Sequence, residues 1–231
     1  MKKSLIITLS FIFIFTINKF KAQSVYTDTS IDKYISDIKP MKVSEESYIG
    51  TPYENETFQH GIISKNGVTI SHQVGLRYNA HKDIFEIKKT MILKDNQATL
   101  LRKSDEIILK INNNTFVYIP ASEKSMKSGY FVVLHKDEKF SLYKKIHKQF
   151  IPGQKAYNSL AQDVAPTFKD KTTLYVMDQD GKLIELPNSK GGKLKVFKDH
   201  KKEVKQFIKE NKLNINKENN LVKLVTYYNN L

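Results

Sequence analysis

The sequence contains no cysteine and only two arginines, Arg77 and Arg102, against 36 lysines. Without cysteine the chain can form neither a disulfide bond nor a lipid anchor on a thiol. The folded core must therefore be stable without covalent cross-links. The scarcity of arginine removes the side chain that most often reads base edges, so we expect no nucleic acid partner. It also raises the question of why Arg77 stands in a strand-like stretch.

Sequence signatures of common enzymes are also missing. The patterns G-x-S-x-G, H-E-x-x-H and G-x-G-x-x-G do not occur, and there is no P-loop. Residues 178–181 resemble a fragment of a calcium loop but lack a third oxygen ligand and a distal glutamate, so we interpret them as a hairpin turn. We therefore expect no metal and no cofactor, and the sequence favours a non-enzymatic binding protein.

The first 24 residues have the pattern of a secretory signal peptide. A basic start at residues 1–3 precedes a mostly apolar run at 5–17, and Ala22 and Ser24 supply small residues before a cleavage site. The apolar run of about 13 residues is shorter than the ~20 that a membrane-spanning helix needs. We expect an exported protein of the periplasm, the outer membrane surface or the medium, with no transmembrane segment after signal removal.

Residues 58–186 have the pattern of an antiparallel sheet, which follows a helix or loop lead-in at 25–57. Turn signals recur between β-rich runs, whereas a parallel sheet would need long crossover connections. These turn signals are Asn66-Gly67, Asp95-Asn96, Asn112-Asn113-Asn114, Lys136-Asp137-Glu138 and Asp180-Gly181. We predict an α+β fold, in which an antiparallel meander, as a sheet or half-barrel, is followed by a C-terminal helical pair.

The C-terminal segment 187–231 carries +7 of the net charge of +10 that remains without residues 1–24, with eleven lysines against four acidic residues. Asp199 can cap a first helix, and Asn214 or Asn216 can cap a second. The apolar positions at helical spacing, which we expect to face inward, are Val204, Phe207, Ile208, Leu221, Leu224, Val225 and Tyr228.

Lys201, Lys205 and Lys209 form one stripe on the first of these helices. In an exported protein such a stripe is a candidate docking surface for an envelope protein or for an anionic surface, such as lipid headgroups or polysaccharide. The alternative is a solvated outer face with no ligand.

A four-residue loop at 80–83 gives Arg77 a defined place. It pairs Arg77 with Glu86 and Tyr78 with Phe85 across two strands, on opposite faces. The planar fork of arginine can hold a carboxylate bidentately, which lysine cannot do, so we interpret these four residues as a structural clamp. The alternative is a hydrolase-type site in which Arg77, Asp83 and Glu86 come together, with Glu86 as the base.

The sequence contains three short motifs, PYxNxxFxxG at 52–61, LRYNxxxDxxE at 76–86 and LVKLVTYYNNL at 221–231. Together they resemble those of a family of exported Bacteroidota proteins that has no assigned activity. The resemblance covers most of the mature chain and implies an envelope or secreted protein, and it supplies no catalytic residues.

We predict that the exported protein lacks residues 1–24. Mass spectrometry of the exported form should show an N-terminus at Val25, or at Gln23 if cleavage follows Ala22. An exported protein that retains Met1 would contradict this prediction.

Overall fold

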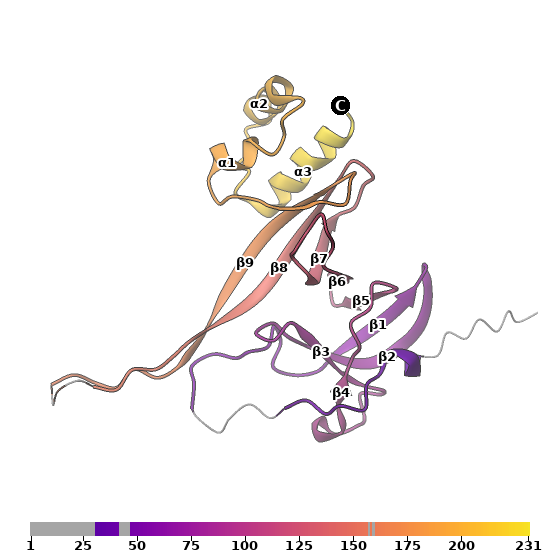
Figure 1. The fold of residues 1–231 in the computed structure, drawn as a ribbon, viewed down its shortest axis with the longest axis vertical. Coiled ribbons are helices and arrows are strands. Elements are labelled where there is room, and N and C mark those ends of the chain that lie inside the picture. The colour runs from indigo at the N-terminus through magenta and orange to yellow at the C-terminus, as the bar shows by residue number, and fades with distance from the viewer. Residues whose placement is uncertain (1–30, 42–46, 157, 159) are drawn as a thin grey trace, which may run out of the picture.

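The computed structural model describes residues 31–41, 47–156, 158 and 160–231. The predicted signal peptide and its cleavage sites lie outside these residues. A ten-stranded antiparallel sheet is followed by C-terminal helices (Figure 1), which confirms the predicted fold class. Within the described ranges, no helix is both long enough and apolar enough to cross a membrane.

The elements follow one another along the chain as strands first and α-helices last. The strands are β1 (Gln59–Lys65), β2 (Val68–Asn79), β3 (Ile84–Lys88), β4 (Thr99–Leu100), β5 (Ile107–Ile111), β6 (Asn114–Ile119), β7 (Gly129–His135), β8 (Phe140–Ile151), β9 (Thr167–Asp178) and β10 (Leu183–Glu185). The helices are α1 (Lys190–Leu194), α2 (Lys201–Glu210) and α3 (Glu218–Asn229), with short 3₁₀ turns η1 (Ile31–Tyr34) and η2 (Asp95–Gln97).

The strand order is β10-β9-β8-β7-β6-β5-β1-β2-β3-β4. Consecutive strands are neighbours except at one place, where β5 pairs with β1 instead of β4. The sheet therefore consists of two meanders, β1–β4 and β5–β10, that share the β1–β5 pair. Residues 101–106 connect β4, at one edge of the sheet, to β5, which lies beside β1. Leu101 in this connection is buried in the core.

Local turn chemistry accounts for most of the hairpins. Asn66 and Gly67 both have positive φ angles, 50° and 78°, which suits the tight turn between β1 and β2. Asp95 and Asn96 lie, as predicted, between two strands that pair antiparallel, but the connection is long, because β3 ends at Lys88 and η2 precedes a two-residue β4. The Asp95 carboxylate binds the Lys88 ammonium at 2.9 Å, which holds this segment as a looped turn on the sheet.

The sheet curves until the turn between β2 and β3 reaches β7 and β8. The Asp83 carboxylate in that turn accepts hydrogen bonds from the Tyr78 hydroxyl at 2.7 Å and the Tyr130 backbone N–H at 3.1 Å. It also pairs with the Lys145 ammonium at 2.7 Å. Because the strand order still has two free ends, the curved sheet remains open.

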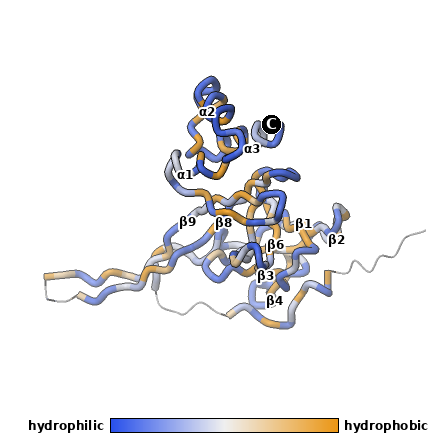
Figure 2. Tube along the Cα trace, turned by 45° about the horizontal axis from the view of Figure 1, so that its top comes forward, coloured by the Kyte–Doolittle hydropathy of each residue, from blue (hydrophilic) through white to orange (hydrophobic). Residues whose placement is uncertain are grey.

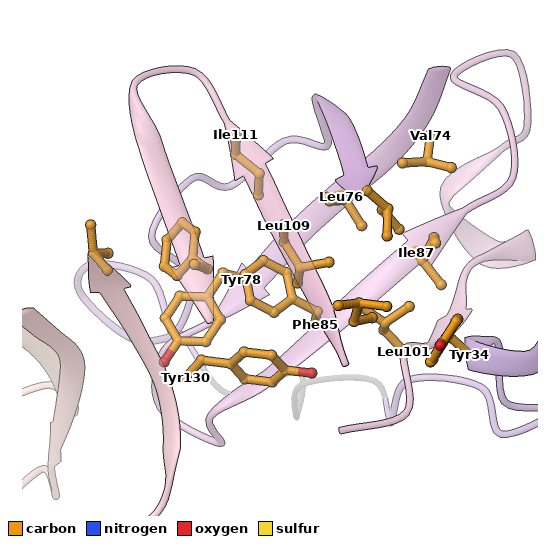
Figure 3. Packing of buried hydrophobic residues seen from close by; sticks show 14 of the residues in the cluster. Tyr34, Val74, Leu76, Tyr78, Phe85, Ile87, Leu101, Leu109, Ile111 and Tyr130 are labelled. Carbon is orange, nitrogen blue, oxygen red and sulfur yellow. The ribbon is translucent and has the colours of Figure 1, made fainter. Parts of the chain in front are cut away.

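An aromatic cluster fills the inner side of this curve. The rings of Tyr78 and Phe85 stack with centroids 4.8 Å apart, and Phe85 meets Tyr130 edge-on at 4.7 Å (Figure 3). All three side chains are buried, and burying each aromatic ring contributes ~1.5–3 kcal/mol to folding. The cluster explains why β2, β3 and β7 converge at this point.

A second core lies between the helices and the upper parts of β8 and β9 (Figure 1). Its buried members are Leu142, Val176, Leu186, Phe197, Val204, Ile208, Leu213, Ile215, Leu221, Leu224, Val225 and Tyr228. Phe207 is partly buried and stacks on Tyr227 at 3.9 Å. The predicted inward faces of α2 and α3 are therefore confirmed.

The helix starts differ from the prediction. Residues 187–231 form three α-helices instead of the predicted pair, because Ser189 accepts a hydrogen bond from the Gly192 N–H and so caps the short additional helix α1. The residues at the N-cap positions of α2 and α3 are His200 and Lys217, without side-chain caps. The Asn214 side chain instead accepts from the Asn216 N–H, closing a turn ahead of α3.

Strands β8 and β9 pair over their full length and project beyond the sheet as a two-stranded arm (Figure 1). Hydrophobic stretches alternate with hydrophilic ones along it (Figure 2). With Pro152, Gly153 and Pro166, residues 152–170 have the composition of a loop, but β9 begins at Thr167. The charged run 169–171 concealed this part of the strand, because aspartate and lysine are depleted in strands.

Gly129 leaves room for the Asp83–Lys145 ion pair, and its φ angle is 129°. A Cβ there would overlap the Asp83 carboxylate and the Lys145 ammonium. We predict that Gly129→Ala lowers the free energy of unfolding by about 1–3 kcal/mol. Gly191→Ala is the control, because a Cβ at Gly191 meets nothing within 4 Å, and alanine inside a helix should add ~0.5–1 kcal/mol. Equal urea midpoints for the two variants would contradict this account.

Candidate functional site

The lysine stripe of α2 lies on the outside of the molecule. Lys201, Lys205 and Lys209 are exposed, whereas Val204 and Ile208 on the other side of the helix are buried. The sequence therefore placed these lysines on the correct face. It did not predict the shape of the surface that surrounds them.

Two of the three lysines line a pocket of about 470 Å³ between α1, α2 and the turn after α2. Its lining consists of three apolar residues, Leu194, Ile208 and Leu213, and four lysines, Lys190, Lys205, Lys209 and Lys212. We call this the basic pocket. Lys201 does not line it, although it continues the stripe by one turn of the helix.

The four ammonium groups of the basic pocket have no acidic partner among the described residues. Lys193 on the same short helix behaves differently. Its ammonium group binds the Asn216 side-chain oxygen at 2.7 Å and the Asn188 carbonyl at 3.4 Å, and burial lowers its pKa. Lys193 is therefore a structural residue, whereas the charges of the basic pocket remain available to an anion.

Lys212 reaches the basic pocket through an unusual backbone conformation. It has a φ of 50°, and the Leu213 N–H donates to the Ile208 carbonyl while the Lys212 N–H donates to the Lys209 carbonyl. This pattern ends a helix and favours glycine at the left-handed position. A lysine there costs on the order of 1–2 kcal/mol. Sequence reasoning missed Lys190 and Lys212, and the Ser189 cap beside Lys190 was the only local signal for either.

The predicted register of β2 and β3 is present, with Arg77 opposite Glu86 and Tyr78 opposite Phe85. The detailed contact differs from a two-oxygen fork. Arg77 Nε and Nη2 both donate to Glu86 Oε2, at 3.0 and 2.7 Å. The second carboxylate oxygen, Oε1, accepts from the Tyr53 hydroxyl at 2.9 Å instead.

The segment around 53–58 covers this ion pair, which sequence reasoning did not predict. The Arg77 guanidinium lies between the rings of Tyr53 and Phe58, at 4.3 and 4.4 Å, and donates to the Glu56 carbonyl. Glu86 is only 1% exposed. Burial, and then the Glu86 charge, raise the pKa of Tyr53 to about 12.

The structure does not bring the residues of the hydrolase alternative into one site. Glu86 is enclosed with Arg77 and Tyr53, whereas Asp83 binds Tyr78, whose side chain lies on the opposite face of the sheet. Asp83 also binds Lys145, and burial lowers the pKa of that lysine. Among the described residues, no cluster of three or more side chains is arranged to hold a metal ion.

No protein family, curated protein or solved structure matches the chain.

We predict that the Arg77–Glu86 pair stabilises the fold. Arg77→Ala should lower the free energy of unfolding by about 3–5 kcal/mol, because it leaves a buried carboxylate without its partner. Arg77→Lys should cost less, since lysine keeps the charge but loses one of the two donors to Oε2. Lys155→Ala is the control, because Lys155 is 92% exposed in its pair with Asp163, and such pairs contribute ~0–1 kcal/mol. A double-mutant cycle between Arg77 and Glu86 with no coupling would show that the interpretation is wrong.

Proposed function

We propose that the protein is an exported, non-enzymatic binding protein that docks on a polyanionic envelope surface through the basic pocket. The observation that carries the proposal is the group of four lysine ammonium groups, without acidic partners among the described residues, beside three apolar residues. Desolvating several like charges at one place is unfavourable, so such a cluster is suited to an anionic ligand.

The use of lysine points to the class of anion. A lysine ammonium is a flexible point charge, whereas arginine holds one planar anion in a fixed geometry. Four lysines therefore suit many mobile phosphates better than a single rigid ligand. Anionic lipid headgroups have this character, and the partly exposed Leu194 beside the lysines can contact the glycerol region beneath them.

Electrostatic attraction from the rest of the segment supports the same interpretation. Residues 187–231 carry a net charge of +7, and a surplus of one sign on one segment speeds encounter with an oppositely charged surface. The predicted export brings this segment to envelope lipids.

We predict that the protein binds vesicles of phosphatidylcholine with phosphatidylglycerol, but not vesicles of phosphatidylcholine alone. Each lysine near an anionic membrane contributes about 1 kcal/mol. The triple variant Lys190→Ala/Lys209→Ala/Lys212→Gly should therefore bind about 100-fold more weakly. Glycine at 212 suits the left-handed backbone, so this variant should remain folded.

The control variant removes three exposed lysines elsewhere, Lys94, Lys110 and Lys139, and changes the net charge equally. Its vesicle affinity, measured by co-sedimentation, should stay close to that of the unaltered protein. Affinity of the unaltered protein should also fall as salt is raised, because exposed charges are screened over ~8–10 Å at physiological ionic strength. Equal losses in both variants, or binding that ignores salt, would overturn the proposal. Binding to an anionic polysaccharide but not to vesicles would identify the polysaccharide as the surface that the protein binds.

A further inference from the structure

Strand β9 is covered along its outer edge at both ends but not in the middle. Near its start, the Ile49 N–H donates to the Pro166 carbonyl and the Phe168 N–H donates to the Ile49 carbonyl, both at 2.8 Å. Near its end, the Leu186 N–H donates to the Leu174 carbonyl at 2.8 Å, and β10 continues the pairing. Between these two contacts β9 is the outermost strand (Figure 1).

The free backbone groups in this gap can be assigned from the alternation of a strand. The outward contacts of β9 are made by Phe168 and Leu174, so the N–H and C=O groups of Asp170 and Thr172 also point outward. In the part of the chain that the structure describes, none of these four groups has a hydrogen-bond partner. Residues 169–172 are exposed, so water alone satisfies them.

The uncovered part of β9 begins directly after Phe168, because the chain turns away from β9 at Gly50. Gly50 has a φ of 82°, and a Cβ there would lie 2.7 Å from the Phe168 carbonyl oxygen. The pairing started by Ile49 therefore stops after one residue. An extended segment of about four to five residues fits between this point and β10.

The charges beside the uncovered part of β9 determine which kind of partner can bind there. Lys169 and Lys171 lie on one face of β9, exposed, and have no ion pair with any residue in the described ranges. A second copy of the chain pairing through the same edge would bring these lysines together, which is unfavourable. On the other face, Asp170 is already paired with Lys148.

The other face also offers a small recess next to the gap. A pocket of about 250 Å³ is lined by Thr172, Leu174 and Leu186, together with polar groups of the helical segment. A side chain placed opposite Thr172 would lie beside it. Because Leu174 and Leu186 form one wall, this position suits a small uncharged side chain.

We propose that the open edge of β9 binds an extended segment of a partner protein as an added strand. The segment carries acidic side chains at two alternate positions, opposite Lys169 and Lys171, and uncharged residues opposite Asp170 and Thr172. The backbone hydrogen bonds of Asp170 and Thr172 provide the attachment, and the two lysines provide the selectivity. This site is separate from the basic pocket and does not depend on its function.

Amide hydrogen exchange of the full exported chain, followed by NMR, tests the proposal directly. In the free protein the amides of Asp170 and Thr172 should exchange quickly, whereas those of Lys169 and Lys171, which face β8, should be protected. A capped peptide of sequence Thr-Val-Glu-Thr-Glu, which matches the length of the gap, should protect the two outward amides. Protection of both amides in the free chain would show that the edge is already occupied and would overturn the proposal.

The charge requirement is tested by exchanging the signs. A matched peptide with lysine in place of both glutamates should bind the unaltered protein about tenfold more weakly. The variant Lys169→Glu/Lys171→Glu should reverse this preference, and because both side chains are exposed it should remain folded. Thr172→Pro removes an outward N–H without removing a bond to β8 and should abolish binding of either peptide. Equal affinities for both peptides, or no binding of the acidic peptide, would contradict the proposal.

Discussion

The carboxylate of Asp83 is held by donors from three different strands, and the shape of the curved sheet depends on it. Asp83 sits at the turn between β2 and β3 with a φ of 56°, which a non-glycine residue adopts only when its surroundings compensate. The compensation comes from Tyr78, Tyr130 and Lys145. These contacts bring β7 and β8 next to β2, and the aromatic cluster packs beneath them. Beyond this point β8 continues as one strand of the arm.

The position of Arg77 answers the question raised by the scarcity of arginine. The Arg77 side chain lies between two rings and donates to the Glu86 carboxylate and the Glu56 carbonyl, whereas the Arg102 side chain is exposed and donates to the Ile35 carbonyl. The Arg77 position needs the fixed geometry that the guanidinium supplies. The surfaces proposed for binding use lysine, whose charge is mobile and tolerant of a variable partner.

Local patterns explain what was predictable from the sequence. The four-residue loop at 80–83 specifies the β2–β3 register, and helical periodicity specifies the inward faces of α2 and α3. Contacts between distant segments have no such periodic signal. The β1–β5 pairing, the cover of residues 53–58 over Arg77 and the approach of Lys190 to Lys212 all depend on tertiary packing. The candidate lysines were therefore found as a stripe, whereas the pocket was not.

The strand order also determines the order in which the chain can fold. Every neighbouring pair but one joins consecutive strands, so each meander can form by zipping hairpins on a microsecond scale. The exception pairs Lys65 with Ile107 across the whole first meander. The entropy of closing that long loop must be overcome before the pairing contributes any stability. We therefore expect docking of the two meanders through β1 and β5 to limit the folding rate, and until it occurs β5 presents an unpaired edge to other chains.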